Sequence, residues 1–142
     1  MDGKEMQLHY DIDGSNFTIA GQASSNIKKV LKQLGIDPTI IRRAAIAMYE
    51  GEINTVIHGK GGECNVFLSP KQIRIIFTDH GPGIADIDKA MQEGFSTADA
   101  EARELGFGAG MGLPNMKKYA DTLEVESVIG KGTTVTITIF IP

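Results

Sequence analysis

The sequence predicts an α+β fold in the form of an α/β sandwich, with helices on one face of a mixed, mostly antiparallel sheet. Two patterns support this prediction. Residues 135–141 alternate between apolar and polar side chains, which is typical of a strand with one buried face. Residues 38–59 form a long helical stretch between short β-branched runs. A chain of 142 residues can bury one core, so we expect a single domain over 1–142.

The N-terminal region is expected to contain two strands and a helix. Residues 6–12 and 17–20 are rich in strand-forming side chains and flank a turn of Asp, Gly, Ser and Asn. Ser24 or Ser25 is a candidate N-cap for a helix that ends near Gly35. The region is therefore expected to contribute two strands to the sheet and one helix to the helical layer.

The long helix has clear signals at both ends. Asp37 is expected to cap it, and Pro38 fits its first turn because proline lacks an N–H group that would be unsatisfied there. The glycines of 59–62 are expected to form the turn that ends it. Gly51 costs about 1 kcal/mol relative to alanine inside a helix, so it indicates close packing at that point.

The second half of the chain alternates between strands and helices around a glycine-rich stretch. Strands are expected at 66–68 and 73–78, and a short helix at 86–92. Residues 93–112 are rich in glycine and small polar residues, which indicates a mobile loop, and 113–120 return to helix. The chain then ends in a hairpin with one buried face, to which Leu123, Val125 and Ser127 contribute on one strand.

Composition excludes several classes of function. The net charge of −4 and the isoelectric point near 5.3 argue against a nucleic-acid-binding protein, which usually carries a basic face. The N-terminus has no apolar signal core, and no run approaches the ~20 apolar residues of a membrane span. Cys64 is the only cysteine, so an internal disulfide is impossible and a reducing compartment fits. We expect a cytoplasmic protein without a nucleic-acid or membrane partner.

A strand ends on an acid at Asp79 and then turns through Gly81 and Gly83. The carboxylate can fix this turn by bonding the backbone two residues on. A buried carboxylate can equally accept a hydrogen bond from an exocyclic amine, such as N6 of adenine. The sequence leaves both interpretations open.

Alternate glycines from Gly106 to Gly112 form a second motif, GFGAGMGLP. It lacks the spacing of the Walker A and dinucleotide-binding motifs. Glycines let backbone N–H groups approach an anion closely, and Leu113-Pro114 opens a helix whose N-terminus also attracts anions. A lid over a triphosphate and a disordered surface loop are the two interpretations.

Glu50 and Asn54 lie four residues apart on one face of the long helix, whereas Glu52 points almost the opposite way. An amide oxygen can bind Mg²⁺, and a carboxylate can deprotonate a nucleophile. A solvated polar stripe is the alternative.

Taken in this order, the motifs resemble the GHKL ATP-binding superfamily, which includes type II topoisomerases, a heat-shock chaperone, histidine kinases and mismatch-repair ATPases. The matching residues are Glu50, Asn54, His58 and Gly59, then Asp79, Gly81, Gly83 and Ile84, then Gly108, Gly110, Gly112 and Leu113, and last Gly130, Gly132 and Thr133. The resemblance implies a Bergerat-type fold with ATP between the helices and the sheet.

The resemblance also implies roles for these residues. Glu50 would be the general base, Asn54 the ligand of Mg²⁺ and Asp79 the partner of adenine. The implied nucleotide-binding set is Asn54, Asp79, Gly81, Gly83, Ile84, Gly106, Gly108, Ala109, Gly110, Met111, Gly112, Leu113 and Thr133. ATP and Mg²⁺ are therefore the expected cofactors.

Within the superfamily, a domain of this size with Ile-His-Gly after the asparagine resembles the bacterial anti-sigma-factor serine kinases and the switch kinases of partner-switching pathways. This implies transfer of the γ-phosphate of ATP to a serine or threonine of an antagonist protein. The expected partners are that antagonist and a sigma factor or phosphatase, and the chain would be a monomer or homodimer. Gly108 stands where several anti-sigma kinases have an arginine. A nucleotide-gated binding module with little catalysis is therefore the alternative function.

Overall fold

The computed structural model describes residues 5–14, 21–58, 60–84, 91 and 112–142. The helices are α1 (Gln22–Gln33), α2 (Pro38–Ile57) and α5 (Gly112–Tyr119), and the strands are β1 (Met6–Asp13), β2 (Gly61–Leu68), β3 (Gln72–Asp79), β4 (Thr122–Val128) and β5 (Gly132–Phe140). The strands form one sheet in the order β1-β2-β3-β5-β4, and all four pairings are antiparallel.

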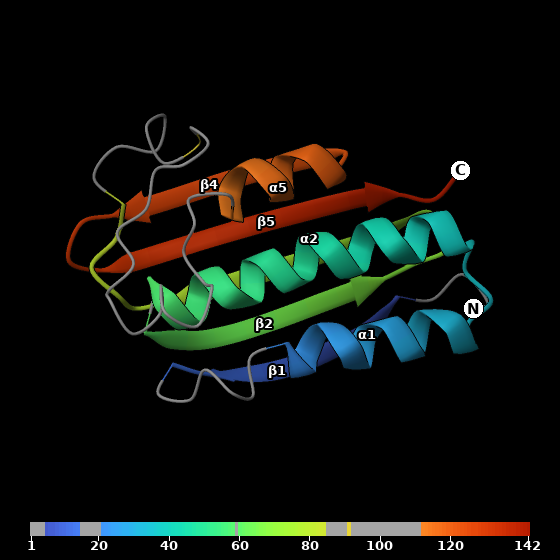
Figure 1. The fold of residues 1–142 in the computed structure, drawn as a ribbon, viewed down its shortest axis with the longest axis horizontal. Helices are drawn as coiled ribbons and strands as arrows, with labels where there is room; N and C mark the ends of the chain where they lie inside the picture. Colours follow the sequence, from blue (N-terminus) through green and yellow to red (C-terminus); the bar gives the residue numbers. More distant parts are fainter. Residues whose placement is uncertain (1–4, 15–20, 59, 85–90, 92–111) are drawn as a thin grey trace.

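The three helices cover one face of the sheet, with α2 across its middle, α1 on the side of β1 and α5 on the side of β4 (Figure 1). The core lies between these two layers, because alternate residues of β2, β3 and β5 point toward the helices and are buried. Its largest fully buried side chains include Ile27, Leu31, Met48, Phe77 and Met116. The predicted α/β sandwich is therefore confirmed, and the described strands are paired in an antiparallel manner throughout.

The predicted serine cap of α1 is wrong. The helix begins after Gly21, which adopts φ 102° and provides no side-chain cap. Its first N–H groups are instead bonded by the carboxylate of Glu52 from α2, and the hydroxyl of Ser24 donates to the Gly21 carbonyl. A charged acceptor from the neighbouring helix thus replaces the local cap that the sequence indicated.

The start of α2 agrees with the prediction. Asp37 accepts a hydrogen bond from the backbone N–H of Thr39 at 2.8 Å, and Pro38 occupies the first turn. The inference that Gly51 marks close packing is also confirmed, because a Cβ atom there would overlap the ring of Phe77. This glycine lets the middle of α2 lie directly on β3.

The predicted turn at the glycines of 59–62 is wrong in its second half. Gly61 and Gly62 belong to β2, which is longer than the predicted strand at 66–68. A Cβ atom on Gly62 would overlap the carbonyl oxygen of Thr78 on β3. These glycines are therefore needed for close approach between neighbouring backbones and not for a turn alone.

The remaining strand and helix predictions divide into confirmed and untested ones. Strand β3 and helix α5 lie within one residue of their predicted bounds, and the predicted C-terminal hairpin is formed by β4 and β5, with β5 beginning earlier than predicted, at Gly132. The predicted strand at 17–20 and most of the segments 86–92 and 93–112 lie outside the described residues. Among the described helices, none combines the length and apolar character needed to cross a membrane.

Candidate functional site

The candidate site lies where β3 ends and β5 begins. Asp79 is the last residue of β3 and is paired directly with Thr133, the second residue of β5. Both side chains are buried, with exposed fractions of 8% and 6%. Gly132 has φ 132°, and a Cβ atom there would overlap the Asp79 carbonyl. The backbone of β5 at Gly132 therefore lies directly against the backbone of Asp79.

The carboxylate of Asp79 fixes the turn that follows it. Its Oδ1 accepts a hydrogen bond from the backbone N–H of Gly81 at 2.9 Å. Gly83 has φ 82° and packs against the carbonyl of Val128, so a side chain at this position would be strained and crowded. The turn interpretation of Asp79 is therefore confirmed, while its role toward adenine stays a prediction.

Ser127 on β4 joins this turn to the hairpin, and our sequence analysis did not assign it to the site. Its Oγ accepts a hydrogen bond from the backbone N–H of Ile84 at 2.7 Å and donates to the Gly132 carbonyl at 3.1 Å. The same oxygen lies 2.9 Å from the hydroxyl of Thr133. A signal was present in the sequence, since Ser127 is a polar residue in the same phase of an alternating strand as Leu123 and Val125, which are partly buried.

The second wall of the site is the face of α2 that carries Glu50 and Asn54. Both side chains are half-buried and lie one helical turn apart. Burial raises the pKa of the Glu50 carboxyl, and a hydrogen bond from Asn115 lowers it. The Nδ2 group of Asn115 on α5 donates this bond to Oε1 of Glu50 at 3.3 Å. No motif of the sequence indicated a role for Asn115.

The end of α2 lies near Asp79. Burial and the charge of Lys60 lower the pKa of His58, whereas the Asp79 carboxylate raises it. The net direction is downward, so His58 is mainly neutral at pH 7. His58 of α2 and Asp79 of β3 thus lie near each other at one end of the molecule.

The glycine-rich motif is only partly described. Gly112 is the first residue of α5, and the side chain of Leu113 is 5% exposed and packs in the core. Gly106, Gly108, Ala109, Gly110 and Met111 lie outside the described residues. Their predicted role as a phosphate lid stays a prediction.

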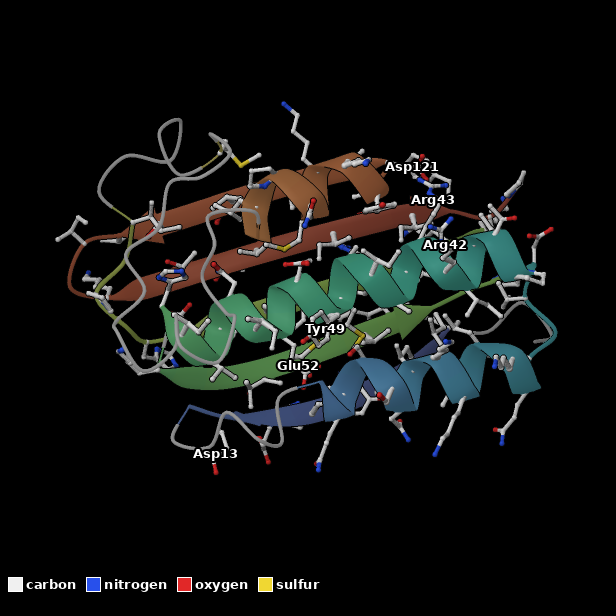
Figure 2. The ribbon with its side chains drawn as sticks, viewed as in Figure 1. Asp13, Arg42, Arg43, Tyr49, Glu52 and Asp121 are labelled. Atoms are coloured by element: carbon white, nitrogen blue, oxygen red, sulfur yellow. The ribbon has the colours of Figure 1, made fainter. Side chains whose placement is uncertain are left out.

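Glu52 belongs to the opposite side of α2 and has a structural role. It is 3% exposed, and its carboxylate accepts hydrogen bonds from the N–H groups of Gly21, Ala23 and Ser24 at 2.9, 3.2 and 3.1 Å. Figure 2 shows its place between α2 and α1. Glu52 therefore faces α1, away from the side of α2 that carries Glu50, as its position in the helix predicted.

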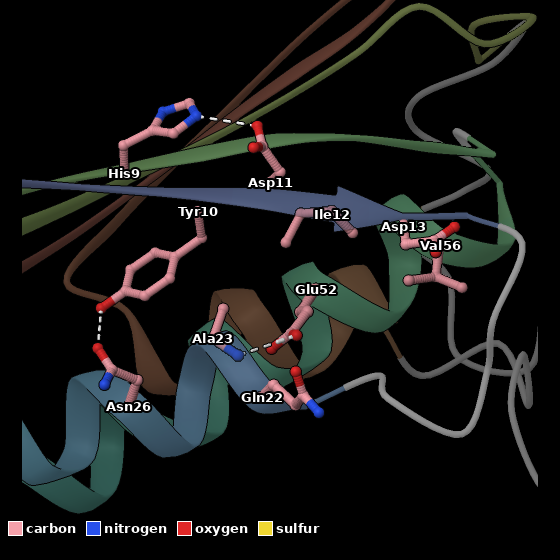
Figure 3. Close-up of a pocket in the computed structure, with 10 residues that line it drawn as sticks. All are labelled: His9, Tyr10, Asp11, Ile12, Asp13, Gln22, Ala23, Asn26, Glu52 and Val56. Carbon is pink, nitrogen blue, oxygen red and sulfur yellow. Dashed lines mark hydrogen bonds and ion pairs between the residues drawn. The ribbon is translucent and has the colours of Figure 1, made fainter.

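A cavity of about 450 Å³ lies beside this carboxylate, between β1 and α1 (Figure 3). Its lining includes Tyr10, whose hydroxyl donates a hydrogen bond to Asn26 on α1 at 2.6 Å. None of the candidate site residues lines it. The cavity is therefore separate from the surface that carries Glu50 and Asp79.

Comparisons with known proteins agree with the motif order. Residues 39–142 match the family described as histidine kinase-, DNA gyrase B-, and HSP90-like ATPase. The chain is 39% identical over 135 residues to the anti-sigma F factor of Thermoanaerobacter sp. (strain X514), a match covering 89% of this chain and 91% of the relative. It is 34% identical over 110 residues to the serine/threonine-protein kinase RsbT of Bacillus subtilis (strain 168), covering 75% and 77% of the two chains.

Solved structures show the same fold at lower sequence identity. One is the RsbU and RsbW domains of a Mycobacterium tuberculosis protein, with a TM-score of 0.65 and 20% identity over 94% of this chain. This chain spans about a third of that one, since the match covers 32% of its length. The mycobacterial sensor histidine kinase MprB matches with a TM-score of 0.54 and 16% identity, covering 95% and 97% of the two chains.

Proposed function

Because the chain belongs to the family of histidine kinase-, DNA gyrase B- and HSP90-like ATPases, we propose that it is an ATP-dependent serine/threonine protein kinase of a partner-switching pathway. In this role it acts as an anti-sigma or switch factor and phosphorylates an antagonist protein. The observation that carries the proposal is that α2, the helix that bears Glu50, packs on β3 through Gly51 and Phe77 and ends with His58 near the buried Asp79–Thr133 pair. The names of the relatives, anti-sigma F factor and serine/threonine-protein kinase RsbT, support the same function.

The proposed reaction uses the raised pKa of Glu50. The hydroxyl oxygen of the antagonist's serine or threonine forms a bond to the γ-phosphorus of ATP, and the bond from that phosphorus to the β–γ bridging oxygen breaks. ADP leaves with the electron pair, and the hydroxyl proton passes to the Glu50 carboxylate. A base with a raised pKa holds this proton better than an ordinary glutamate at the same pH.

The residues present fit a bound Mg²⁺-nucleotide. Asn54 offers a half-buried amide oxygen, and Mg²⁺ prefers oxygen ligands while keeping several waters and phosphate oxygens. When bound, the metal neutralises charge on the β- and γ-phosphates. Asp79 would accept a hydrogen bond from the adenine amine through its Oδ2 atom, because Oδ1 is bonded to Gly81.

Mg-ATP is expected to stabilise the protein against thermal unfolding. At a free concentration 100-fold above the dissociation constant, binding to the folded state adds about 2.7 kcal/mol to the free energy of unfolding. A thermal scan with and without millimolar Mg-ATP measures this. An unchanged melting temperature would contradict nucleotide binding and with it the proposed function.

Asp79→Asn is expected to weaken ATP binding by roughly 10- to 150-fold, the equivalent of 1.5–3 kcal/mol for a hydrogen bond to a charged group. Asparagine has nearly the same shape and can still accept the Gly81 N–H through its oxygen. Its amide nitrogen then replaces the acceptor that adenine would use. Calorimetric titration of both proteins with ATP measures the change, and equal affinities would leave Asp79 as a turn residue only.

Transfer of labelled phosphate from γ-labelled ATP to a co-purified partner protein tests the kinase activity directly. ATP binding without transfer to the true partner would instead favour a nucleotide-gated binding module. Recovery of the partner with and without ATP from the source organism supplies the substrate for this assay.

A further inference from the structure

Helix α5 is held firmly against α2 at its C-terminal end. The Nε atom of Arg43 on α2 donates a hydrogen bond to the Tyr119 carbonyl at 3.1 Å, and its guanidinium forms an ion pair with Asp121 at 3.1 Å. Asp121 in turn accepts a hydrogen bond from the backbone N–H of Phe140 at 2.7 Å. Figure 2 shows Arg43 and Asp121 together at this end of the helical layer.

The inner face of α5 is also fixed by the core. Leu113 is 5% exposed, and Met116 is fully buried. Asn115 lies between these two residues in the sequence and is half-buried. Because Leu113 and Met116 are packed on either side of it, the backbone of α5 at Asn115 is held in place.

Asn115 reaches the half-buried carboxylate of Glu50 on α2. Its Nδ2 group donates to Oε1 of Glu50 at 3.3 Å. This bond occupies one carboxylate oxygen and leaves Oε2 to accept a proton. It also stabilises the ionised form of Glu50, since a donor to a carboxylate favours its charged state.

We propose that Asn115 is a positioning residue that orients Glu50 for proton transfer and couples this orientation to α5, the helix that begins at the last glycine of the 106–112 motif. The inference rests on the proposed function, because it requires Glu50 to act as a base. In this proposal the contact between α2 and α5 sets the orientation of the Glu50 carboxylate. Any movement of the first turn of α5 changes the hydrogen bond that holds the base.

The test compares Asn115→Ala and Asn115→Asp with the parent chain, each assayed with Mg-ATP for nucleotide affinity and for turnover. Turnover is phosphate transfer to the partner, or slow ATP hydrolysis. Asn115→Ala is expected to lower kcat roughly 10-fold, the scale of one hydrogen bond to a charged group, with the dissociation constant of Mg-ATP nearly unchanged. Asn115→Asp keeps the shape but replaces the donor by a like charge, so its loss should be larger.

A double-mutant cycle separates positioning from a general loss of structure. In a Glu50→Gln background the base is absent, so Asn115→Ala should have little further effect on kcat. Lys118→Ala is the matched control, since Lys118 lies exposed on the same helix, and its kcat should equal that of the parent.

Three results would overturn the inference. The first is a kcat of Asn115→Ala equal to that of the parent. The second is a loss of nucleotide affinity in Asn115→Ala as large as its loss of turnover. The third is a loss of kcat on Asn115→Ala that is equally large in the Glu50→Gln background. Failure of the proposed function gives a different result, in which the parent itself binds no ATP or shows no turnover with its partner.

Discussion

Glu50→Gln is expected to lower phosphoryl transfer by about 10²–10⁴-fold, the usual contribution of a positioned general base. Glutamine keeps the size of the side chain and its oxygen can still accept the bond from Asn115. It cannot take the proton of the attacking hydroxyl. The affinity for Mg-ATP should stay close to that of the parent, so the loss appears in kcat.

The matched control for this variant is Glu124→Gln, because Glu124 is an exposed carboxylate on β4, the strand at the edge of the sheet. It should leave both turnover and affinity unchanged. Measurable turnover that survives Glu50→Gln at the parent rate would show that Glu50 is not the base.

The pH dependence of turnover gives an independent check on Glu50. Burial raises the pKa of this carboxyl, so its ionised form is lost at a higher pH than for an exposed glutamate. Since only the ionised form accepts a proton, kcat should fall as the pH decreases through this raised pKa. In Glu50→Gln the acid limb that belongs to Glu50 should disappear.

Glu52→Gln is expected to lower the free energy of unfolding by about 3 kcal/mol. The Glu52 carboxylate bonds three backbone N–H groups at the start of α1. An amide group can accept with only one of its two terminal atoms, and its NH₂ group would face donors. Each buried donor left without a partner costs about 1–3 kcal/mol, and the charge that complements the helix N-terminus is also lost.

Chemical unfolding monitored by circular dichroism measures this loss. Glu126→Gln, an exposed carboxylate on β4, is the control and should change the free energy of unfolding by less than about 0.5 kcal/mol. A Glu52→Gln protein as stable as the control would mean that the bonds to α1 contribute little. ATP affinity per folded molecule should be unaffected, since Glu52 faces away from the candidate site.

The features that the sequence predicted are those with local causes. The Asp37 cap, the Gly35 stop and the alternation of β5 depend on neighbouring residues, and the structure contains all three. The cap of α1 was missed because its acceptor, Glu52, comes from 28 residues farther along the chain. The sequence did contain an indication of this contact, because Glu52 is a single acid between apolar residues of the α2 sequence.

The candidate site divides in the same way. His58 and Asp79 belong to separate motifs of the sequence, and the packing of α2 on β3 brings them near each other at one end of the molecule. Ser127 and Asn115 act through contacts across 43 and 65 residues of sequence, and single polar residues carry no pattern that specifies such distant partners. Only tertiary structure identifies them.

The pairing of β3 with β5 has a consequence for changes in the length of the chain that connects them. Asp79 and Thr133 are held by the ladder between these central strands, and the connecting chain includes the loop that the sequence predicts at 93–112, before α5 and β4. The entropy of closing such a loop grows slowly, by only about 0.6 kcal/mol for each doubling of its length. Insertions or deletions within 92–111, where the sequence predicts a loop, should therefore change the stability of the fold little and leave the sheet that holds Asp79 intact.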